Sequence, residues 1–107
     1  MAWYECVSHF FAGLFLTNAV PHWVSGLMGH AFQTPFARLR GKRQSSSMLN
    51  VAWGAFNAAV GYVLLWHVSM FDVRDVGQVA TVAVPSVTGS LLLARRFGRF
   101  NGGNDPR

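Results

Sequence analysis

The sequence predicts an all-α membrane protein with three transmembrane helices and a short amphipathic helix at the membrane interface between the first two. Three observations predict this fold class. Of the 107 residues, 51% are apolar and 12% are charged, long stretches are almost free of charge, and the cations lie between and after those stretches. A soluble domain needs a more polar surface, whereas lipid requires an apolar one. We expect residues 1–101 to form one domain and residues 102–107 to be a disordered tail.

The first apolar stretch predicts a transmembrane helix over about residues 3–21. It reads WYECVSHFFAGLFLTNAV, with Glu5 as its one charged residue. Eighteen residues rise about 27 Å, slightly less than a hydrocarbon core, so a continuation past Pro21 with a kink stays open. Trp3 and Tyr4 suit the outer membrane interface. A cleaved signal peptide is not expected, because no early positive charge and no A-x-A-like site is found.

After Pro21, the sequence predicts an amphipathic helix over about residues 22–32. Its apolar residues follow the helical spacing i, i+3, i+4 and i+7: Val24, Leu27, Met28 and Ala31. The segment is too short to cross a bilayer and too polar to be buried in lipid, so we place it along the cytoplasmic interface. Pro35 is expected to end this region, because the residue before a proline is pushed out of helical geometry.

The rest of the chain predicts a basic loop and two more transmembrane helices. The loop is RLRGKRQSSS, residues 38–47, and the apolar stretch at residues 48–71 contains no formal charge. Residues 76–94 predict the third helix. Pro85 is compatible with it in lipid, because neighbouring helices can satisfy a carbonyl that a proline leaves free. A re-entrant hairpin is the alternative for this third segment.

Positive charge predicts the orientation of the chain. The basic loop and the segment after the third helix hold eight of the nine Lys and Arg residues, which leaves Arg74 for the other side. By the positive-inside rule, the loop and the C-terminus are cytoplasmic and the N-terminus is outside, in a bacterial inner membrane. The cations expected to meet lipid head groups are Arg38, Arg40, Lys42, Arg43, Arg95, Arg96 and Arg99. No nucleic-acid motif accompanies the charge, so we expect lipid and not nucleic acid as its partner.

Two short patterns accompany these helices. NAVPHWVSGLMGHAFQTPFA, residues 18–37, has the form N-A-x-P-H...G...G...F-x-[ST]-P-F-[AS], and V-x-W-G-x-x-N-x-x-x-G is made by Val51, Trp53, Gly54, Asn57 and Gly61. Both resemble a family of small uncharacterised bacterial inner-membrane proteins. The resemblance covers about half the chain and excludes the third helix. It implies the same membrane architecture and carries no catalytic role with it.

His9 and His67 are candidates for cofactor binding. If the first helix runs inward and the second outward, both lie near the outer leaflet, where facing imidazoles can ligate haem iron or a pigment magnesium. Phe10, Phe11 and Trp66 could line such a macrocycle. The simpler interpretation is that these histidines hydrogen-bond to head groups or to neighbouring residues.

The sequence predicts no metal site and no catalytic residues. His22 and His30 are eight residues apart, about 12 Å along a helix, and cannot share one metal ion. Cys6 has no second cysteine to pair with and is interpreted as a small packing residue. A nucleotide loop, mid-membrane acids and a nucleophile beside a base are all absent from the sequence.

Small and amide residues predict where the helices meet. Asn18 and Asn57 lie deepest in their helices and each needs a hydrogen-bond partner, with a quinone, lipid or substrate contact as the alternative. Gly54, Ala58 and Gly61 share one stripe of the second helix and predict a close helix contact.

The two sides of the first helix predict a partner. His9 and Asn18 are nine residues apart and project from opposite sides of the helix. We expect a three-helix bundle to shield only one of these sides, so the other side should meet the head-group zone or a second protein.

Three functions are compatible with these features. We expect a non-enzymatic accessory or structural subunit of a larger respiratory or photosynthetic membrane complex, or self-association. The alternatives are a small haem b- or pigment-binding subunit and an oligomeric transporter. A transporter usually needs an ionisable residue in mid-membrane, and Glu5 lies too near the surface to serve.

Overall fold

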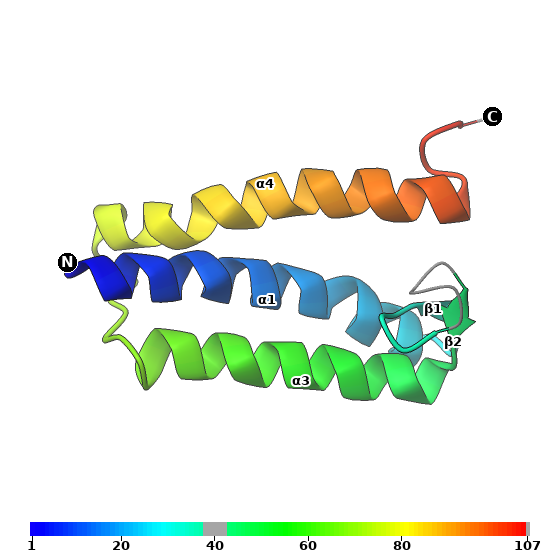
Figure 1. Ribbon diagram of the computed structural model, residues 1–107, viewed down its shortest axis with the longest axis horizontal. Coiled ribbons are helices and arrows are strands. Elements are labelled where there is room, and N and C mark those ends of the chain that lie inside the picture. The colour runs from blue at the N-terminus through cyan, green and yellow to red at the C-terminus, as the bar shows by residue number, and fades with distance from the viewer. Residues whose placement is uncertain (38–42, 107) are drawn as a thin grey trace.

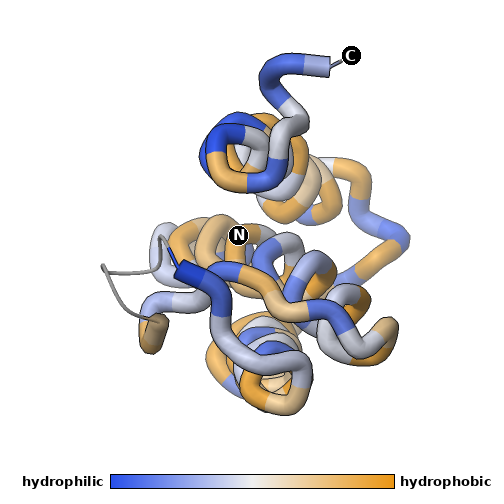
Figure 2. The backbone as a smooth tube through the Cα atoms, turned by 90° about the vertical axis from the view of Figure 1, so that its right-hand side faces the viewer, coloured by the Kyte–Doolittle hydropathy of each residue, from blue (hydrophilic) through white to orange (hydrophobic). Residues whose placement is uncertain are grey.

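Three helices and a short β-ribbon make up the part of the chain that the computed structural model describes, residues 1–37 and 43–106. The elements are α1 (Trp3–Leu27), β1 (Phe32–Gln33), β2 (Gln44–Ser45), α3 (Ser47–Trp66) and α4 (Val76–Asn101). Figures 1 and 2 show α1 between α3 and α4, and α1 packs against both. The N-terminus and the α3–α4 connection lie at one end, which we call the N-terminal end (Figure 1). The β-ribbon and the C-terminus lie at the other, the basic end.

The interior of this bundle is polar and its exterior is apolar. The buried hydrophobic residues are only Ala12, Ala19 and Leu65 among the described residues. The buried polar residues are more numerous: Ser8, His9, His22, Gln33, Thr34, Ser45, Asn50, Asn57 and Ser69. Large apolar side chains of all three helices are exposed, among them Phe10, Phe56 and Leu91. This distribution is the reverse of that in a soluble domain, where large apolar side chains fill the core.

The helix α1 continues through Pro21, so the predicted separate helix over residues 22–32 is wrong. Residues 22–27 form the last turns of α1. Pro21 has no N–H and leaves the carbonyl of Thr17 without its usual helical donor, but it does not end the helix. The end comes at Gly29, which has a φ of 74° that glycine adopts without strain. The N–H of His30 then donates to the carbonyl of Ser25, as in a Schellman motif.

A two-stranded antiparallel ribbon follows α1, which sequence reasoning did not predict. Phe32 pairs with Ser45 and Gln33 pairs with Gln44. The ribbon brings the end of α1 and the start of α3 together. Residues 38–42 of the predicted basic loop, including Arg38, Arg40 and Lys42, lie outside the described residues.

The second predicted helix is confirmed as α3 but is shorter than expected. It begins after Ser46, whose hydroxyl accepts a hydrogen bond from the N–H of Leu49 at 3.2 Å. It ends at Trp66 and not at residue 71, because the chain turns there. The hydroxyl of Ser69 donates back to the carbonyl of Leu65 at 2.8 Å and closes that turn.

The third predicted helix is confirmed as α4 and is longer than expected. Asp75 caps its start by accepting from the N–H of Gln78 at 3.2 Å. The helix runs without interruption past Pro85, which excludes the re-entrant hairpin, and ends at Gly102 with a φ of 83°. The tail predicted to be disordered turns back, and the Asn104 amide donates to a carbonyl of α4.

Two of the described helices, α3 and α4, are long and apolar enough to cross a membrane. Of the three spans predicted from the sequence, two are therefore apolar enough to cross a membrane, and α1 is not. With 25 residues α1 is long enough, but its polar residues lower its hydropathy. Those residues include Glu5, Ser8, His9, Asn18 and His22.

Candidate functional site

His9 is buried near the N-terminal end and connects all three helices. Its side chain is 1% exposed. Nδ1 lies 2.9 Å from the Thr81 hydroxyl on α4, and Nε2 lies 3.1 Å from the Ser69 hydroxyl after α3. The ring also meets Phe71 edge to face, at 5.2 Å between centroids. We call His9, Ser69 and Thr81 the His9 cluster.

The two hydroxyls of the His9 cluster determine how its protons are arranged. The Ser69 hydroxyl lies within donating distance of the Leu65 carbonyl, and the Thr81 hydroxyl within donating distance of the Gln78 carbonyl. If both hydroxyls donate there, His9 must donate from both ring nitrogens, which only the imidazolium form does. A neutral ring requires one hydroxyl to turn its proton toward His9. The cluster is thus a hydrogen-bond network that links α1, the end of α3 and α4.

His67 is the predicted partner of His9 in cofactor binding, but it is not among the residues that contact the His9 ring. It is exposed at the C-terminal cap of α3, where its ring contacts Tyr62. His9 would have to release a hydroxyl before binding a haem iron. The described residues hold no cluster of three or more His, Cys, Asp or Glu side chains suited to a metal ion. The haem and pigment hypotheses therefore stay predictions.

His22 is the second buried histidine and lies near the basic end, where its partner is Asn50. The side chain of His22 is 2% exposed, and its Nδ1 lies 2.8 Å from Oδ1 of Asn50. The Asn50 amide nitrogen lies 2.9–3.2 Å from the carbonyl oxygens of Phe32, Ser45 and Ser46, which share its two N–H donors. Because the nitrogen must face these carbonyls, Oδ1 faces His22 and can only accept. A neutral His22 therefore carries its proton on Nδ1, and its Nε2 is a hydrogen-bond acceptor.

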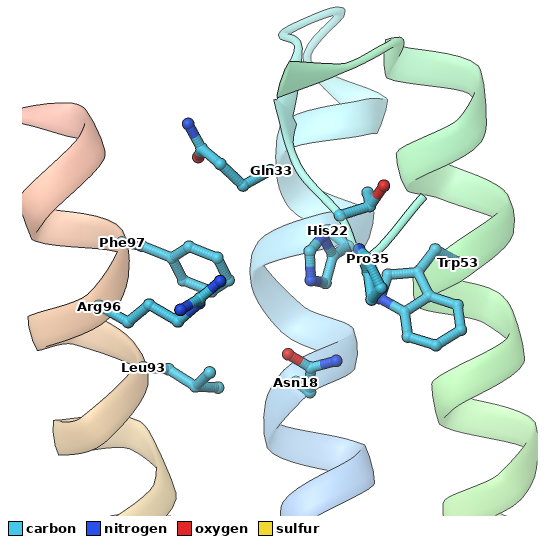
Figure 3. A pocket seen from close by; sticks show the side chains of 9 residues that line it. Asn18, His22, Gln33, Pro35, Trp53, Leu93, Arg96 and Phe97 are labelled. Carbon is cyan, nitrogen blue, oxygen red and sulfur yellow. The ribbon is translucent and has the colours of Figure 1, made fainter. Parts of the chain in front are cut away.

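Asn18 is oriented in the same way through α3. The Asn57 amide nitrogen donates to the Trp53 carbonyl at 2.7 Å, so its oxygen is left to accept. The Asn18 nitrogen donates to that oxygen at 3.2 Å. Figure 3 shows the consequence: the Asn18 oxygen points away from α3, toward α4. Two acceptors of α1, at positions 18 and 22, thus lie one helical turn apart.

The predicted small-residue stripe of α3 lies against α1. A Cβ added at Gly54 would be 2.7 Å from the backbone nitrogen of Trp23, and one added at Gly61 would be 2.5 Å from Leu16. Ala58 is half-buried between them. These glycines, like Asn18 and Asn57, therefore make contacts between α1 and α3 of the same chain.

The argument that one side of α1 needs an outside partner is therefore overturned. His9 meets Thr81 of α4, and Asn18 meets Asn57 of α3. Because α1 lies in the middle of the bundle, its two neighbours cover both sides.

A cavity of about 180 Å³, lined by both polar and apolar side chains, lies between α1, the β-ribbon and α4 at the basic end (Figure 3). Its lining residues are Asn18, His22, Gln33, Thr34, Pro35, Trp53, Leu93, Arg96 and Phe97. Five of these nine residues belong to the two sequence patterns described above. Sequence reasoning did not bring them together as a site, because they come from four separate segments.

Hydrogen bonds and rings close the walls of the cavity. Gln33 accepts from the Asn101 amide at 2.9 Å, which ties β1 to the end of α4. His22 meets Phe97 edge to face at 5.8 Å. The Nε1 of Trp53 is buried without a hydrogen-bond partner in the described part of the chain. Such an unpaired donor costs about 1–3 kcal/mol.

Sequence reasoning missed Asn50, although a signal for it existed. The buried residues of α3 are Asn50, Gly54, Asn57, Gly61 and Leu65, a single helical stripe. Asn50 and Asn57 are seven residues apart and share that face. The hydrogen-bond acceptors of Asn50 could not be inferred, because the ribbon that supplies two of these carbonyls was not predicted.

The basic residues near the cavity lie at one end of the bundle. Arg43 precedes β2, while Arg95, Arg96 and Arg99 lie in the last turns of α4. Figure 2, which looks along the bundle from this end, shows hydrophilic residues gathered on the near part of α4. Figure 3 shows Arg96 extended toward α1, at the rim of the cavity. Arg96, which was predicted to meet lipid head groups, thus also lines the cavity.

No protein family, curated protein or solved structure matches this chain. The family resemblance of the two patterns therefore stays a prediction.

Proposed function

We propose that this chain is a three-span integral membrane protein that serves as an accessory subunit of a larger inner-membrane complex. The observation that carries the membrane part is the reversed distribution of side chains. Leu91, Phe56 and Phe10 are 69%, 55% and 46% exposed, while His22 and Asn50 are 2% and 0% exposed. In water this arrangement would leave a large apolar surface uncovered, whereas lipid covers it.

The central position of α1 supports its crossing together with the other two helices. Its 25 residues rise about 37 Å, longer than the roughly 30 Å hydrocarbon core. Its polar side chains bond to α3 and α4 and are shielded from lipid, as the contacts of His9 and Asn18 show. The lower hydropathy of α1 thus follows from its place in the interior.

Charge supports an orientation with the N-terminus outside. Arg95, Arg96 and Arg99 lie at the basic end, together with Arg43. The other end holds two acids and Arg74 in the α3–α4 connection. By the positive-inside rule the basic end is cytoplasmic.

The outer faces of α3 and α4 support the role of a subunit. In the most apolar stretch of α4 only 11% of residues are buried, against 28% in α3, so one whole side of α4 is open. Val84, Val87 and Leu91 are more than 60% exposed on that helix. Such a side can pack against another membrane protein without disturbing the bundle.

Site-specific crosslinking in the membrane tests the subunit role. A photoreactive residue in place of Val84 or Leu91 should give one adduct of defined mass, because a fixed neighbour covers the same face. The matched control is Ala12, which is 0% exposed and should give no intermolecular adduct. Adducts with lipid alone, together with a single-chain mass after gentle solubilisation, would contradict the subunit role.

A further inference from the structure

The cavity at the basic end presents two acceptors and one cation to whatever occupies it, and the unpaired Nε1–H donor of Trp53 also belongs to its lining. Nε2 of a neutral His22 and Oδ1 of Asn18 both accept, since their other polar atoms are bonded to Asn50 and Asn57. Neither acceptor has a hydrogen-bond donor among the described residues. Arg96 supplies positive charge at the rim (Figure 3).

We propose that this cavity binds the head group of an anionic phospholipid that carries free hydroxyls, the chemistry of phosphatidylglycerol. The proposal rests on the membrane insertion proposed above, because it requires the basic end to lie at head-group depth. The hydroxyls occupy the cavity, the phosphate lies at Arg96, and an acyl chain follows the surface of α4.

The two acceptors call for hydroxyl donors. Positions 18 and 22 are one helical turn apart on one face, where Cβ atoms are about 5–6 Å from each other. Two neighbouring hydroxyls of one ligand can donate to two acceptors at this spacing. A phosphodiester alone brings no proton for them, so charge without hydroxyls leaves both acceptors unpaired.

The cation selects the charge of the ligand. The guanidinium of Arg96 forms strong charge-assisted hydrogen bonds with a phosphate. Arg95 and Arg99 add positive charge at the same end, which disfavours a head group with a cationic amine.

The size of the cavity suits a glycerol unit. Its volume is about 180 Å³. An apolar protein cavity of about 150 Å³ holds benzene, which has six non-hydrogen atoms. Glycerol also has six. The phosphate is then left at the rim, where Arg96 lies.

An apolar groove of about 420 Å³ continues from the cavity and argues for a lipid over a soluble polyol phosphate. It is lined by Thr17, Val20, Pro21, Phe32, Ser90, Leu93, Ala94 and Phe97. Leu93 and Phe97 line both the groove and the cavity. A chain attached to the head group can therefore lie between α1 and α4, against these two side chains.

Lipid titration of the delipidated full-length chain in detergent, followed by native mass spectrometry, tests the proposal. The probes are phosphatidylglycerol, phosphatidylmethanol, phosphatidylcholine and free glycerol phosphate. Phosphatidylmethanol keeps the negative phosphodiester and lacks the hydroxyls. We expect it to bind about tenfold more weakly than phosphatidylglycerol, because two hydrogen bonds are lost. Phosphatidylcholine should bind more weakly still.

Two pairs of variants locate the binding. Arg96→Gln should weaken phosphatidylglycerol binding about tenfold, while Arg99→Gln, a matched cation that does not line the cavity, should change it less than twofold. Leu93→Trp should fill the space where the cavity and the groove meet and weaken phosphatidylglycerol binding. Leu92→Trp, at a neighbouring position that is 65% exposed, should leave binding unchanged. Arg96 is exposed, so its substitution leaves the fold intact.

Several results would overturn the proposal. Equal binding of phosphatidylmethanol and phosphatidylglycerol would show that charge alone is recognised. Equal effects of the two arginine variants would place the lipid on the general basic surface. Tight binding of glycerol phosphate alone would make the occupant a soluble molecule. A chain that stays in the membrane fraction yet shows no lipid preference would overturn this site alone, whereas a chain soluble without detergent would first overturn the membrane proposal.

Discussion

Asn50 shows most clearly how one residue organises the basic end. Its amide is 0% exposed: the oxygen accepts from His22, and the two N–H groups are shared among three carbonyl oxygens. It therefore joins α1, α3 and the ribbon at one point. It also determines the tautomer of a neutral His22: the proton is on Nδ1, so Nε2 is left as a hydrogen-bond acceptor at the cavity. In a low-dielectric interior such a network is stable only when every member is paired.

Replacing Asn50 with Leu should lower the free energy of unfolding by about 2–4 kcal/mol, because the His22 N–H and several carbonyls lose their partner. Unfolding by SDS titration in mixed micelles measures this. The control is Asn101→Ala, which removes an exposed amide bonded to Gln33 and should cost less than about 1 kcal/mol. Equal losses in the two variants would contradict the central role of Asn50.

His9 illustrates how far residue-level reasoning reached. Its place near the N-terminal end of the first helix was evident from the sequence. Its partners Ser69 and Thr81 were not, because Ser69 lies in a turn that was expected to be helical and Thr81 comes from α4. The sequence left a cofactor and a hydrogen bond to a head group or neighbouring residue as the two interpretations of His9. The structure shows hydroxyl groups within hydrogen-bond distance of both ring nitrogens, as in the second, simpler interpretation.

At the scale of elements, close contacts on both sides of α1 determine the packing. Gly54 and Gly61 of α3 admit the backbone of Trp23 and the side chain of Leu16. On the opposite side, Gly13 of α1 lies against α4, where an added Cβ would be 2.5 Å from the Val82 carbonyl. Small residues are therefore needed on both interfaces, as is usual where helices meet in lipid.

Gly54→Leu should separate α1 from α3, because the new side chain meets the Trp23 backbone, which cannot rotate away. We expect a loss of about 1–3 kcal/mol in the free energy of unfolding, again by SDS titration. Ala55→Leu is the matched control, since Ala55 is exposed on the same helix and should tolerate the change. A similar loss at both positions would show that the contact at Gly54 is not limiting.

The ends of the elements were the least predictable features. The sequence placed the end of the first span near Pro21 and left a continuation past it with a kink open, while Gly29 was given no role. The helix passes the proline and ends just before the glycine. Pro21 removes one donor, which a packed helix tolerates. Gly29 adopts a positive φ that reverses the chain.

For the whole molecule, the reversed distribution of side chains and the segregation of charge predict one orientation. In a Cys6→Ser background, Ala2→Cys should react with a membrane-impermeant maleimide from outside the inner membrane. Asn104→Cys should react only after permeabilisation, because the proposed orientation places the basic end in the cytoplasm. Labelling of spheroplasts followed by mass analysis measures this.

The controls for this topology experiment come from the same bundle. Ala12→Cys lies in the interior, 0% exposed, and should react only after denaturation. Reaction of Asn104→Cys from outside would reverse the orientation. Reaction of both terminal cysteines from the same side would mean that only two of the three helices cross.

The sequence by itself determined the helical class, the approximate positions of α3 and α4 and the concentration of positive charge near one end. These are properties of composition and spacing along the chain, so they can be read without knowing which segments meet. Only the tertiary structure decided that α1 lies in the middle, that the ribbon forms, and that His22, Asn18 and Arg96 face one cavity. These features depend on contacts between distant segments, and the burial of a polar residue is favourable only when its partner is already in place.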